Sequence, residues 1–200
     1  MGEFTYETNN ISKKLETYEW NNIWWEQTDN ETAKRILYIG DSISCGTRHL
    51  ITNLSESKIL CDGFGTSKAL DNPYFKPSLE LFMKQQSKCD VILFNNGLHG
   101  WHLSDEEYEK YYDEMLLFLL KTKKQIFILL TTDDIVHPNR TEIVKARNKI
   151  ATLLAQKYNL PVIDLYSVAR NNPELHVPDG VHFNPDGYKL LAKCILESIA

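Results

Sequence analysis

Residues 35–44 read RILYIGDSIS, and this stretch decides the fold of the chain. Its first half is a continuous apolar run, which is typical of a strand buried on both faces of a parallel sheet. Gly40 and Asp41 then turn the chain, and Ser42 stands where a helix should begin. Ligands of open α/β sheets bind beyond the carboxyl ends of the strands, so Ser42 is expected at the mouth of a site. The simpler role for this serine is that of a helix N-cap.

Four further apolar runs alternate with helical patterns after this stretch. They lie at residues 57–61, 90–95, 125–130 and 161–165. Alternation of this kind predicts an α/β fold with a five-stranded parallel sheet and helices on both faces, that is, three α/β/α layers. Residues 34–200 are expected to form this single domain.

Residues 1–33 are expected to form an aromatic-rich extension that packs on the domain. Trp20 and Trp24 share a face if this stretch is helical. A short helix or coil that buries its aromatic rings against the domain is the simpler interpretation. An aromatic platform for a sugar ring, or a contact in a homo-oligomer, is the alternative.

The composition of the chain argues against some classes of binding partner. The net charge is −5 and no basic cluster occurs, so nucleic acid is not expected as a partner. No apolar run is long enough to cross a membrane, and residues 1–10 lack the basic and apolar regions of a signal peptide. The four cysteines are scattered without metal-ligand spacing. Together these features predict a cytoplasmic protein without a nucleic-acid or membrane partner.

A second motif lies near the carboxyl terminus, in residues 177–187. It places Asp179 three positions before His182, in a Pro/Gly-rich loop that precedes an apolar helix. A serine hydroxyl needs a general base within hydrogen-bond reach, and that base needs a partner that sets its tautomer. His182 and Asp179 can supply these two functions for Ser42. Asp164 is a rival acid and His176 a rival base, but neither belongs to such a pair.

On these two motifs the chain resembles the GDSL, or SGNH, hydrolase family. Gly40-Asp41-Ser42 followed by Ile43 looks like the first block of the family, and Asp179-x-x-His182 looks like the last. The resemblance runs from about residue 34 to the end of the chain. It implies a flavodoxin-like fold with strand order 2-1-3-4-5, a Ser42–His182–Asp179 triad, and no metal or organic cofactor.

The resemblance also implies an oxyanion hole that includes the backbone N–H of Ser42. Residues 62–67 form a predicted glycine-rich turn, in which Gly65 matches the glycine of the second block better than Gly63 does. The third block of the family is G-x-N-D, and here His99 falls at the position of its Asn. Either His99 takes that role or Asn96 reaches in from earlier in the loop, because both side chains can donate a hydrogen bond to an oxyanion.

The function expected from the resemblance is hydrolysis of small acyl esters through an acyl-enzyme. An acetyl ester on a carbohydrate is favoured, because the aromatic residues, Trp101 among them, suit sugar rings. Asp41 and Trp101 are expected to contact the substrate. A lysophospholipase or thioesterase of the same family is one alternative. A non-catalytic saccharide-binding domain on a decayed hydrolase scaffold is another, and the altered third block is its support.

Overall fold

Strand β2 (Lys34–Gly40) lies at the centre of the sheet in the computed structural model, which describes residues 18–86 and 88–199. Parallel neighbours flank it on both sides, β3 (Ile59–Thr66) and β4 (Val91–Phe94). Strands β5 (Gln125–Leu129) and β6 (Val162–Ile163) continue the sheet beyond β4. Numbered along the chain, these five parallel strands run 2-1-3-4-5, so the predicted order is confirmed.

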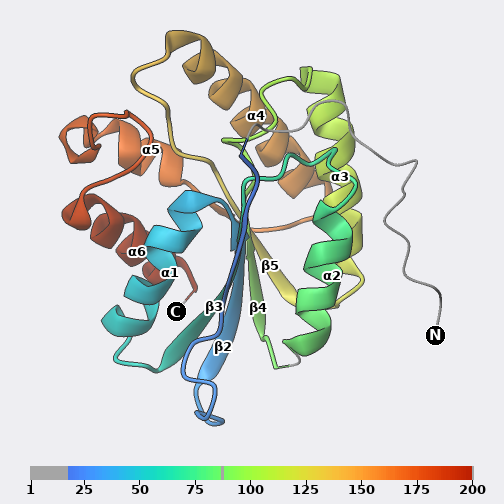
Figure 1. Cartoon of the computed structure of the whole chain (residues 1–200), viewed down its shortest axis with the longest axis vertical. Coiled ribbons are helices and arrows are strands. Elements are labelled where there is room, and N and C mark those ends of the chain that lie inside the picture. The colour runs from blue at the N-terminus through green and yellow to red at the C-terminus, as the bar shows by residue number, and fades with distance from the viewer. Residues whose placement is uncertain (1–17, 87, 200) are drawn as a thin grey trace.

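Helices cover both faces of the sheet (Figure 1). Alternate residues of β2 point to opposite faces, so Leu37 and Ile39 enter one core while Ile36 and Tyr38 enter the other. The first core is closed by α2 (Phe75–Gln85), α3 (Asp105–Leu120) and most of α4 (Pro138–Lys157). The second is closed by α1 (Ser42–Leu54), α5 (Leu165–Arg170) and α6 (Pro185–Ile199), and a short 3₁₀ turn, η1 (Pro173–Leu175), precedes α6. The expected three layers are therefore present.

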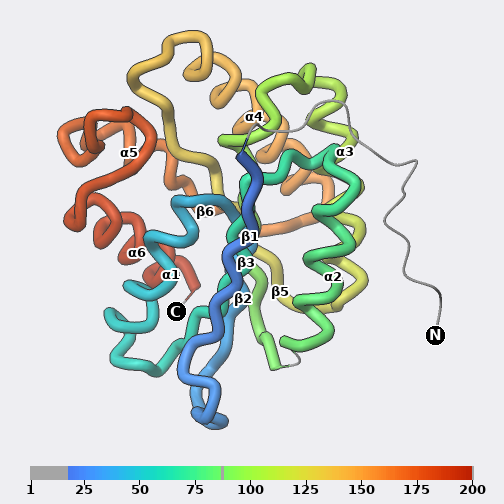
Figure 2. Tube along the Cα trace, viewed as in Figure 1, coloured from blue at the N-terminus to red at the C-terminus, as the bar shows by residue number. Residues whose placement is uncertain are grey.

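A sixth strand, β1 (Asn21–Trp24), corrects the expected strand count. It pairs antiparallel with β3, and Figure 2 shows the two strands side by side. The stretch around Trp20 and Trp24 is thus extended, where a short helix or coil was predicted. The reason is tertiary, because β1 supplies hydrogen-bond partners to the edge of β3 that a five-stranded sheet would leave open. Residues 1–17 of the predicted extension lie outside the described residues.

The glycine-rich turn predicted at residues 62–67 is also corrected, because β3 continues through it to Thr66. Gly63 and Gly65 are strand residues that face helix α1. A Cβ on Gly63 would lie 2.5 Å from Arg48 Cδ, and one on Gly65 would lie 2.4 Å from Cys45 Sγ. The two glycines therefore let α1 approach the sheet closely.

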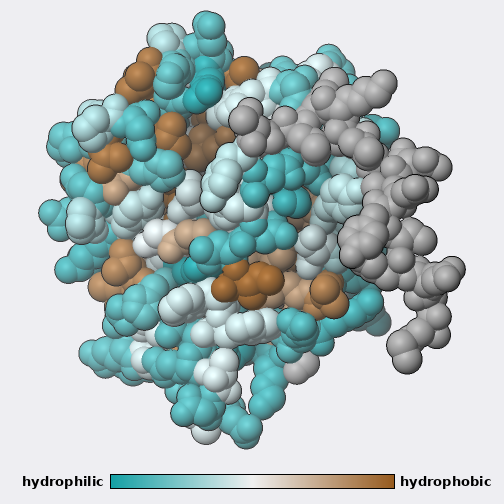
Figure 3. Space-filling view, in the orientation of Figure 1, coloured by the Kyte–Doolittle hydropathy of each residue, from teal (hydrophilic) through white to brown (hydrophobic). Residues whose placement is uncertain are grey.

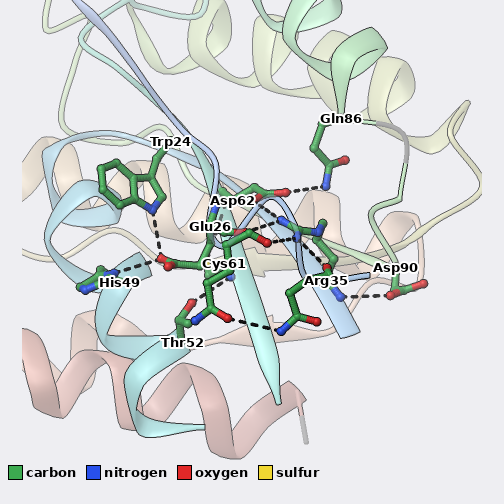
Figure 4. A network of polar contacts seen from close by, with 11 residues as sticks. Trp24, Glu26, Arg35, His49, Thr52, Cys61, Asp62, Gln86 and Asp90 are labelled. Carbon is green, nitrogen blue, oxygen red and sulfur yellow. Dashed lines mark hydrogen bonds and ion pairs between the residues drawn. The ribbon is translucent and has the colours of Figure 1, made fainter. Parts of the chain in front are cut away.

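A buried polar network joins the segment that follows β1 to the middle of β3 and the end of α2 (Figure 4). Asp62 is fully buried, and its Oδ1 accepts hydrogen bonds from Arg35 Nη1 at 2.6 Å and from the Glu26 N–H at 2.9 Å. Its Oδ2 accepts one from Gln86 Nε2 at 2.9 Å. The Glu26 carboxylate in turn accepts from Trp24 Nε1 at 3.0 Å. Segments far apart in the sequence are thus joined by one carboxylate.

The surface is mostly polar, and on the face drawn in Figure 3 apolar side chains form small separate patches. Within the described residues, no helix combines the length and apolar character that a membrane crossing requires.

Candidate active site

The candidate site lies where β2 runs into helix α1. Asp41 is the N-cap of α1, and its Oδ1 accepts a hydrogen bond from the Ile43 N–H at 2.9 Å. Ser42 is therefore the first residue of the helix and not its cap, so the cap role suggested for it passes to Asp41. The sharp exit from a buried strand leaves the Ser42 hydroxyl beyond the carboxyl end of the sheet.

His182 lies between Ser42 and Asp179. Its Nε2 is 2.8 Å from Ser42 Oγ, and its Nδ1 is 2.7 Å from Asp179 Oδ2. Ser42 and His182 are 140 positions apart in the chain. The structure thus brings together the three residues that the sequence selected, with one imidazole nitrogen for the hydroxyl and the other for the carboxylate.

The Asp179 carboxylate is fixed by the loop that carries it. Its Oδ1 accepts hydrogen bonds from the N–H groups of Val181 and His182, each at 2.9 Å. Partial burial raises the pKa of Asp179, but these two N–H groups and the His182 side chain outweigh that effect and lower the pKa to about 2. Asp179 is therefore an anion at neutral pH, as an orienting and charge-stabilising partner of a histidine must be.

The rival acid and base have other partners. Asp164 caps helix α5, where it accepts hydrogen bonds from the Ser167 N–H at 2.8 Å and from its Oγ at 2.6 Å. The His176 ring packs on Phe183, with ring centroids 4.3 Å apart. These contacts hold both residues in structural roles beside α5 and before α6.

Asp41 is buried, in contrast to the substrate contact expected of it. Only 1% of its surface is exposed, and no described residue donates a hydrogen bond to its Oδ2. Burial raises the pKa of Asp41, while the nearby His99 and His182 imidazoles and the Ile43 N–H act in the opposite direction. The structure therefore gives Asp41 a capping position beneath the serine.

Gly65 lies near Ser42 through the register of the sheet, because it pairs with Gly40, two residues before the serine. Gly63 pairs with Tyr38, further back along β2. Of the two candidate glycines, Gly65 is thus the one at the carboxyl edge of the sheet.

The loop after β4 carries Asn96 and His99. Asn96 is buried, and its Nδ2 donates to the Lys68 carbonyl at 3.0 Å while its backbone carbonyl accepts from Tyr108 Oη at 2.7 Å. One of the two donors of the Asn96 amide thus already has a partner within the chain. His99 is half-buried, and its ring meets the Trp20 ring edge-on, with centroids 6.5 Å apart.

Trp101 follows in the same loop and is half-buried. The Arg140 guanidinium lies 5.0 Å from its ring centroid, and that of Arg147 lies 5.1 Å away. Both distances are within the range of a cation–π contact. Trp101 therefore packs against two guanidinium groups of helix α4.

Asp133 and Asp134, in the loop after β5, are both fully buried. Asp133 Oδ2 pairs with Arg170 Nη1 at 2.9 Å, and Asp134 Oδ2 with Arg140 Nη1 at 3.1 Å. Burial raises the pKa of Asp134, but hydrogen bonds from His137 and Arg140 outweigh it and lower that pKa overall.

These ion pairs shape a loop that touches the histidine loop. The Ile135 N–H donates to the Gly180 carbonyl at 2.9 Å, and a Cβ on Gly180 would lie 2.4 Å from Val136 Cγ2. Gly180 has a φ of +74°, which glycine adopts without strain. The loop after β5 thus supports the segment that carries Asp179 and His182.

The sequence predicts that Trp20 packs on the domain, with an aromatic platform as the alternative, and it does not single out Arg147. Trp20 enters the candidate site because β1 joins the sheet, and its backbone is fixed by the Ser67 side chain and N–H. Arg147 belongs to a stretch whose sequence has the pattern of a long amphipathic helix. Its one available signal was an arginine on the apolar side of that helix, since it lies three residues after Val144 and three before Ile150.

Comparison with known proteins connects this geometry to a family. The family model "GDSL-like Lipase/Acylhydrolase" matches residues 105–195, a segment that contains Asp179 and His182 and begins after Ser42. No curated protein matches the chain.

Solved structures share the fold at low sequence identity. An acetyl xylan esterase, AlAXEase, has 18% identity and a TM-score of 0.65, covering 83% of this chain and 100% of its own. A lipase/acylhydrolase from Enterococcus faecalis has 20% identity and a TM-score of 0.67, covering 83% and 95%. A catalytic mutant of an acetylxylan esterase from Geobacillus stearothermophilus has 16% identity and a TM-score of 0.67, covering 84% and 95%.

At such identities the solved structures show the fold alone, and the family model matches residues 105–195. The strand order, the motif at Ser42 and the matched segment agree with one another. Residues 105–195 therefore match the GDSL-like lipase/acylhydrolase family model, and the chain shares its fold with solved acetyl xylan esterases and a lipase/acylhydrolase; together these likenesses support a carboxylic ester hydrolase.

Proposed function

We propose that the protein is a serine esterase that removes small acyl groups, acetyl above all, from a carbohydrate. The observation that carries the proposal is the position of His182, 2.8 Å from Ser42 Oγ and 2.7 Å from Asp179 Oδ2. A nucleophile, a base and an orienting carboxylate in this arrangement form the template of acyl transfer by a serine.

In the proposed mechanism, Ser42 Oγ attacks the ester carbonyl carbon and gives its proton to His182 Nε2. The carbonyl oxygen becomes an oxyanion in the tetrahedral intermediate. The C–O bond to the leaving alcohol then breaks, and His182 returns the proton to that alcohol. Water attacks the acyl-enzyme in the same way and releases the acid and the free Ser42 hydroxyl. Asp179 keeps the imidazole in the required tautomer and stabilises its protonated form.

The oxyanion is proposed to bind the backbone N–H groups of Ser42 and Gly65 together with one side chain of the loop after β4. Between the two candidates for that side chain, the structure supports His99, because Asn96 is buried with one amide N–H donating to the Lys68 carbonyl, whereas His99 is half-buried. Loss of one oxyanion donor typically lowers kcat by about 10²–10³-fold. We therefore expect His99→Ala to lower kcat on this scale and Asn96→Ala to act mainly on stability.

An aromatic rim supports a saccharide as the group that carries the ester. Trp20 and Trp101 both lie in or beside the loop that holds His99, and both are half-buried rather than fully enclosed. Aromatic rings with one accessible part are suited to contact a polar ring that also has apolar faces. The acetyl xylan esterases among the solved structures with this fold agree with this choice of substrate.

Hydrolysis of a chromogenic acetate ester by wild type and by Ser42→Ala tests the proposal. Wild type should turn over, and the variant should lose about 10⁶-fold in kcat, as expected for loss of a triad serine. Equal activity of the two proteins would show that Ser42 is not the nucleophile. Two inactive proteins that still bind acetylated saccharide would favour the binding-domain alternative.

Acyl-chain length separates the proposed acetylesterase from a lysophospholipase or thioesterase. With aryl acetate, butyrate and octanoate as substrates, kcat/KM should be highest for acetate. A rise of kcat/KM with chain length would point to a lipid or thioester substrate instead. Acetylated xylo-oligosaccharides and monosaccharide acetates then test the carbohydrate part.

A further inference from the structure

Arg147 is the largest fully buried side chain among the described residues, with 1% of its surface exposed. It projects from the middle of helix α4 into the region behind the candidate site. An arginine stays charged at every ordinary pH, so burying it is unfavourable unless its N–H groups find acceptors. The hydrogen-bond acceptors around the Arg147 guanidinium indicate its role.

Three backbone carbonyls of one loop accept hydrogen bonds from the Arg147 guanidinium. Nη1 donates to the Gly97 carbonyl at 2.8 Å and to the His99 carbonyl at 2.7 Å. Nη2 donates to the Gly100 carbonyl at 2.6 Å. The planar fork of an arginine can hold several acceptors at fixed angles, which a lysine cannot do.

Aromatic rings hold the guanidinium itself in place. Its central carbon lies 5.1 Å from the Trp101 ring centroid and 4.7 Å from that of Tyr108. Tyr108 also donates from Oη to the Asn96 carbonyl at 2.7 Å. Four carbonyls of the segment 96–100 are therefore bound by two buried side chains, one from α3 and one from α4.

The His99 ring leaves this segment toward the site. It meets Trp20 edge-on, and it lies close enough to the Asp41 carboxyl beneath Ser42 to act on the pKa of that group. The peptide on which His99 stands is thus fixed by Arg147 through the carbonyls on either side of it and through its own carbonyl. A peptide without these bonds would have several conformations, and the ring would be out of place in most of them.

We propose that Arg147 is a positioning residue of the esterase, whose guanidinium holds the segment 97–100 so that His99 can donate to the oxyanion. This inference rests on the proposed function, because it gives Arg147 a purpose within that reaction. The contacts of Arg147 described above are with the loop carbonyls and with the Trp101 and Tyr108 rings, so its proposed effect on kcat passes through the position of His99.

The first test compares Arg147→Met and Arg147→Lys with wild type on a chromogenic acetate. We expect Arg147→Met to lower kcat by about 10²-fold, close to the loss of one oxyanion donor, with KM changed far less. Arg147→Lys should recover part of the loss, because an ammonium group can donate to one or two of the three carbonyls. A change confined to KM would contradict the proposal.

A double-mutant cycle with His99→Ala separates positioning from general damage. If Arg147 acts through His99, the double variant Arg147→Met/His99→Ala should be little worse than the worse single variant. Effects on kcat that multiply would mean that the two residues act independently, and they would overturn the proposal.

Amide hydrogen exchange provides a readout that does not depend on activity. Peptides that cover residues 96–101 should exchange faster in Arg147→Met, while the strands of the sheet keep their wild-type protection. Unchanged exchange in this segment would overturn the proposal, and so would faster exchange throughout the chain, which indicates global destabilisation. Arg147→Lys, the milder change, keeps the test decisive if Arg147→Met does not fold.

Arg170→Met is the matched control. Like Arg147, Arg170 has a hydrogen-bonded guanidinium and a ring contact, here with Asp133 and Tyr166, but it lies on α5 and not against the segment 96–101. In Arg170→Met, amide hydrogen exchange at residues 96–101 should equal that of wild type. If wild type is no more active than Ser42→Ala, the proposed function has failed. If wild type is active and Ser42→Ala is not, additive cycles or unchanged exchange show that the inference about Arg147 alone has failed.

Discussion

At the scale of single residues, the His182 imidazole is the group on which the candidate chemistry depends. One of its nitrogens faces Ser42 and the other faces Asp179. Asp179 is itself held by the Val181 and His182 N–H groups, so the four residues 179–182 organise their own acid and base. The pairing is local, and this makes it robust to changes elsewhere in the fold.

Replacing Asp179 by Asn should leave the loop folded, because an amide oxygen still accepts the two backbone N–H bonds. The imidazole would lose the partner that sets its tautomer, and kcat should fall by about 10⁴-fold on an acetate ester. Asp164→Asn is the control, since Asp164 only caps α5. A comparable loss in Asp164→Asn would mean that the acid has been assigned to the wrong aspartate.

The low pKa of Asp179 also predicts how stability depends on pH. Its pKa is about 2 in the folded protein and about 3.9 in an unfolded chain. The unfolded state therefore takes up the proton first on acidification. The stabilisation that comes from ionised Asp179 is fully present above about pH 4 and is lost as the pH falls toward 2.

Melting temperatures of wild type and Asp179→Asn between pH 2 and 7 measure this contribution. Any advantage of wild type should be constant above about pH 5 and should shrink below about pH 4. The effect should be small and salt-sensitive, because about half of the Asp179 side chain is exposed. A difference that grows on acidification would contradict the assigned direction of the pKa shift.

At the scale of elements, the packing of helix α1 on strand β3 decides where the serine stands. Two glycines of β3 leave room for Cys45 and Arg48 of the helix. Asp41 caps the helix at the end of β2, so the strand and the helix meet within two residues of Ser42. A shift of α1 away from the sheet would move Ser42 relative to His182, which belongs to a different loop.

Gly65→Ala tests this packing. The new methyl group would lie 2.4 Å from Cys45 Sγ, so the helix or the strand must move. We expect a loss of about 1–3 kcal/mol in the free energy of unfolding, the usual range for overpacking. Adding Cys45→Ala removes the sulfur and should recover most of the loss in urea unfolding. A double variant as unstable as Gly65→Ala would show that contacts other than the sulfur decide the cost.

At the scale of the whole molecule, one end of the sheet carries the candidate site and another part stabilises the fold. The carboxyl edge carries the loops of the candidate site, while polar side chains further back tie β1, β2, β3 and α2 together (Figure 4). Asp62 is the centre of that network. It pairs with Leu37 in the sheet, three positions before the Gly40–Gly65 pair beside Ser42.

Asp62→Ala should therefore affect stability and not catalysis. The change leaves the Arg35 guanidinium, which is mostly buried, without its carboxylate, and breaking such a pair costs about 3–5 kcal/mol. We expect a large loss in the free energy of unfolding by urea, with kcat on an acetate ester close to wild type in the protein that stays folded. A clear loss of kcat in the folded variant would mean that the network also shapes the site.

Much of this architecture could be predicted because its signals are local. Apolar runs such as residues 90–95 mark buried strands, and the right-handed crossover rule limits how parallel strands connect. The Asp179–His182 pair could be predicted because both residues belong to one short loop. Strand β1 could not, because its antiparallel pairing with β3 depends on an edge that exists only after the sheet has formed.

By itself the sequence determined the α/β alternation, the place of Ser42 at the end of a buried strand, and the residues able to act as acid and base. The tertiary structure decided which groups surround them. It brought His182 to Ser42 across 140 positions, and it placed Arg147 under the carbonyls of a loop about 50 positions earlier. The physical reason is that periodicity and short motifs follow from neighbours along the chain, whereas a buried guanidinium or an edge strand is specified by partners that only folding brings within hydrogen-bond distance.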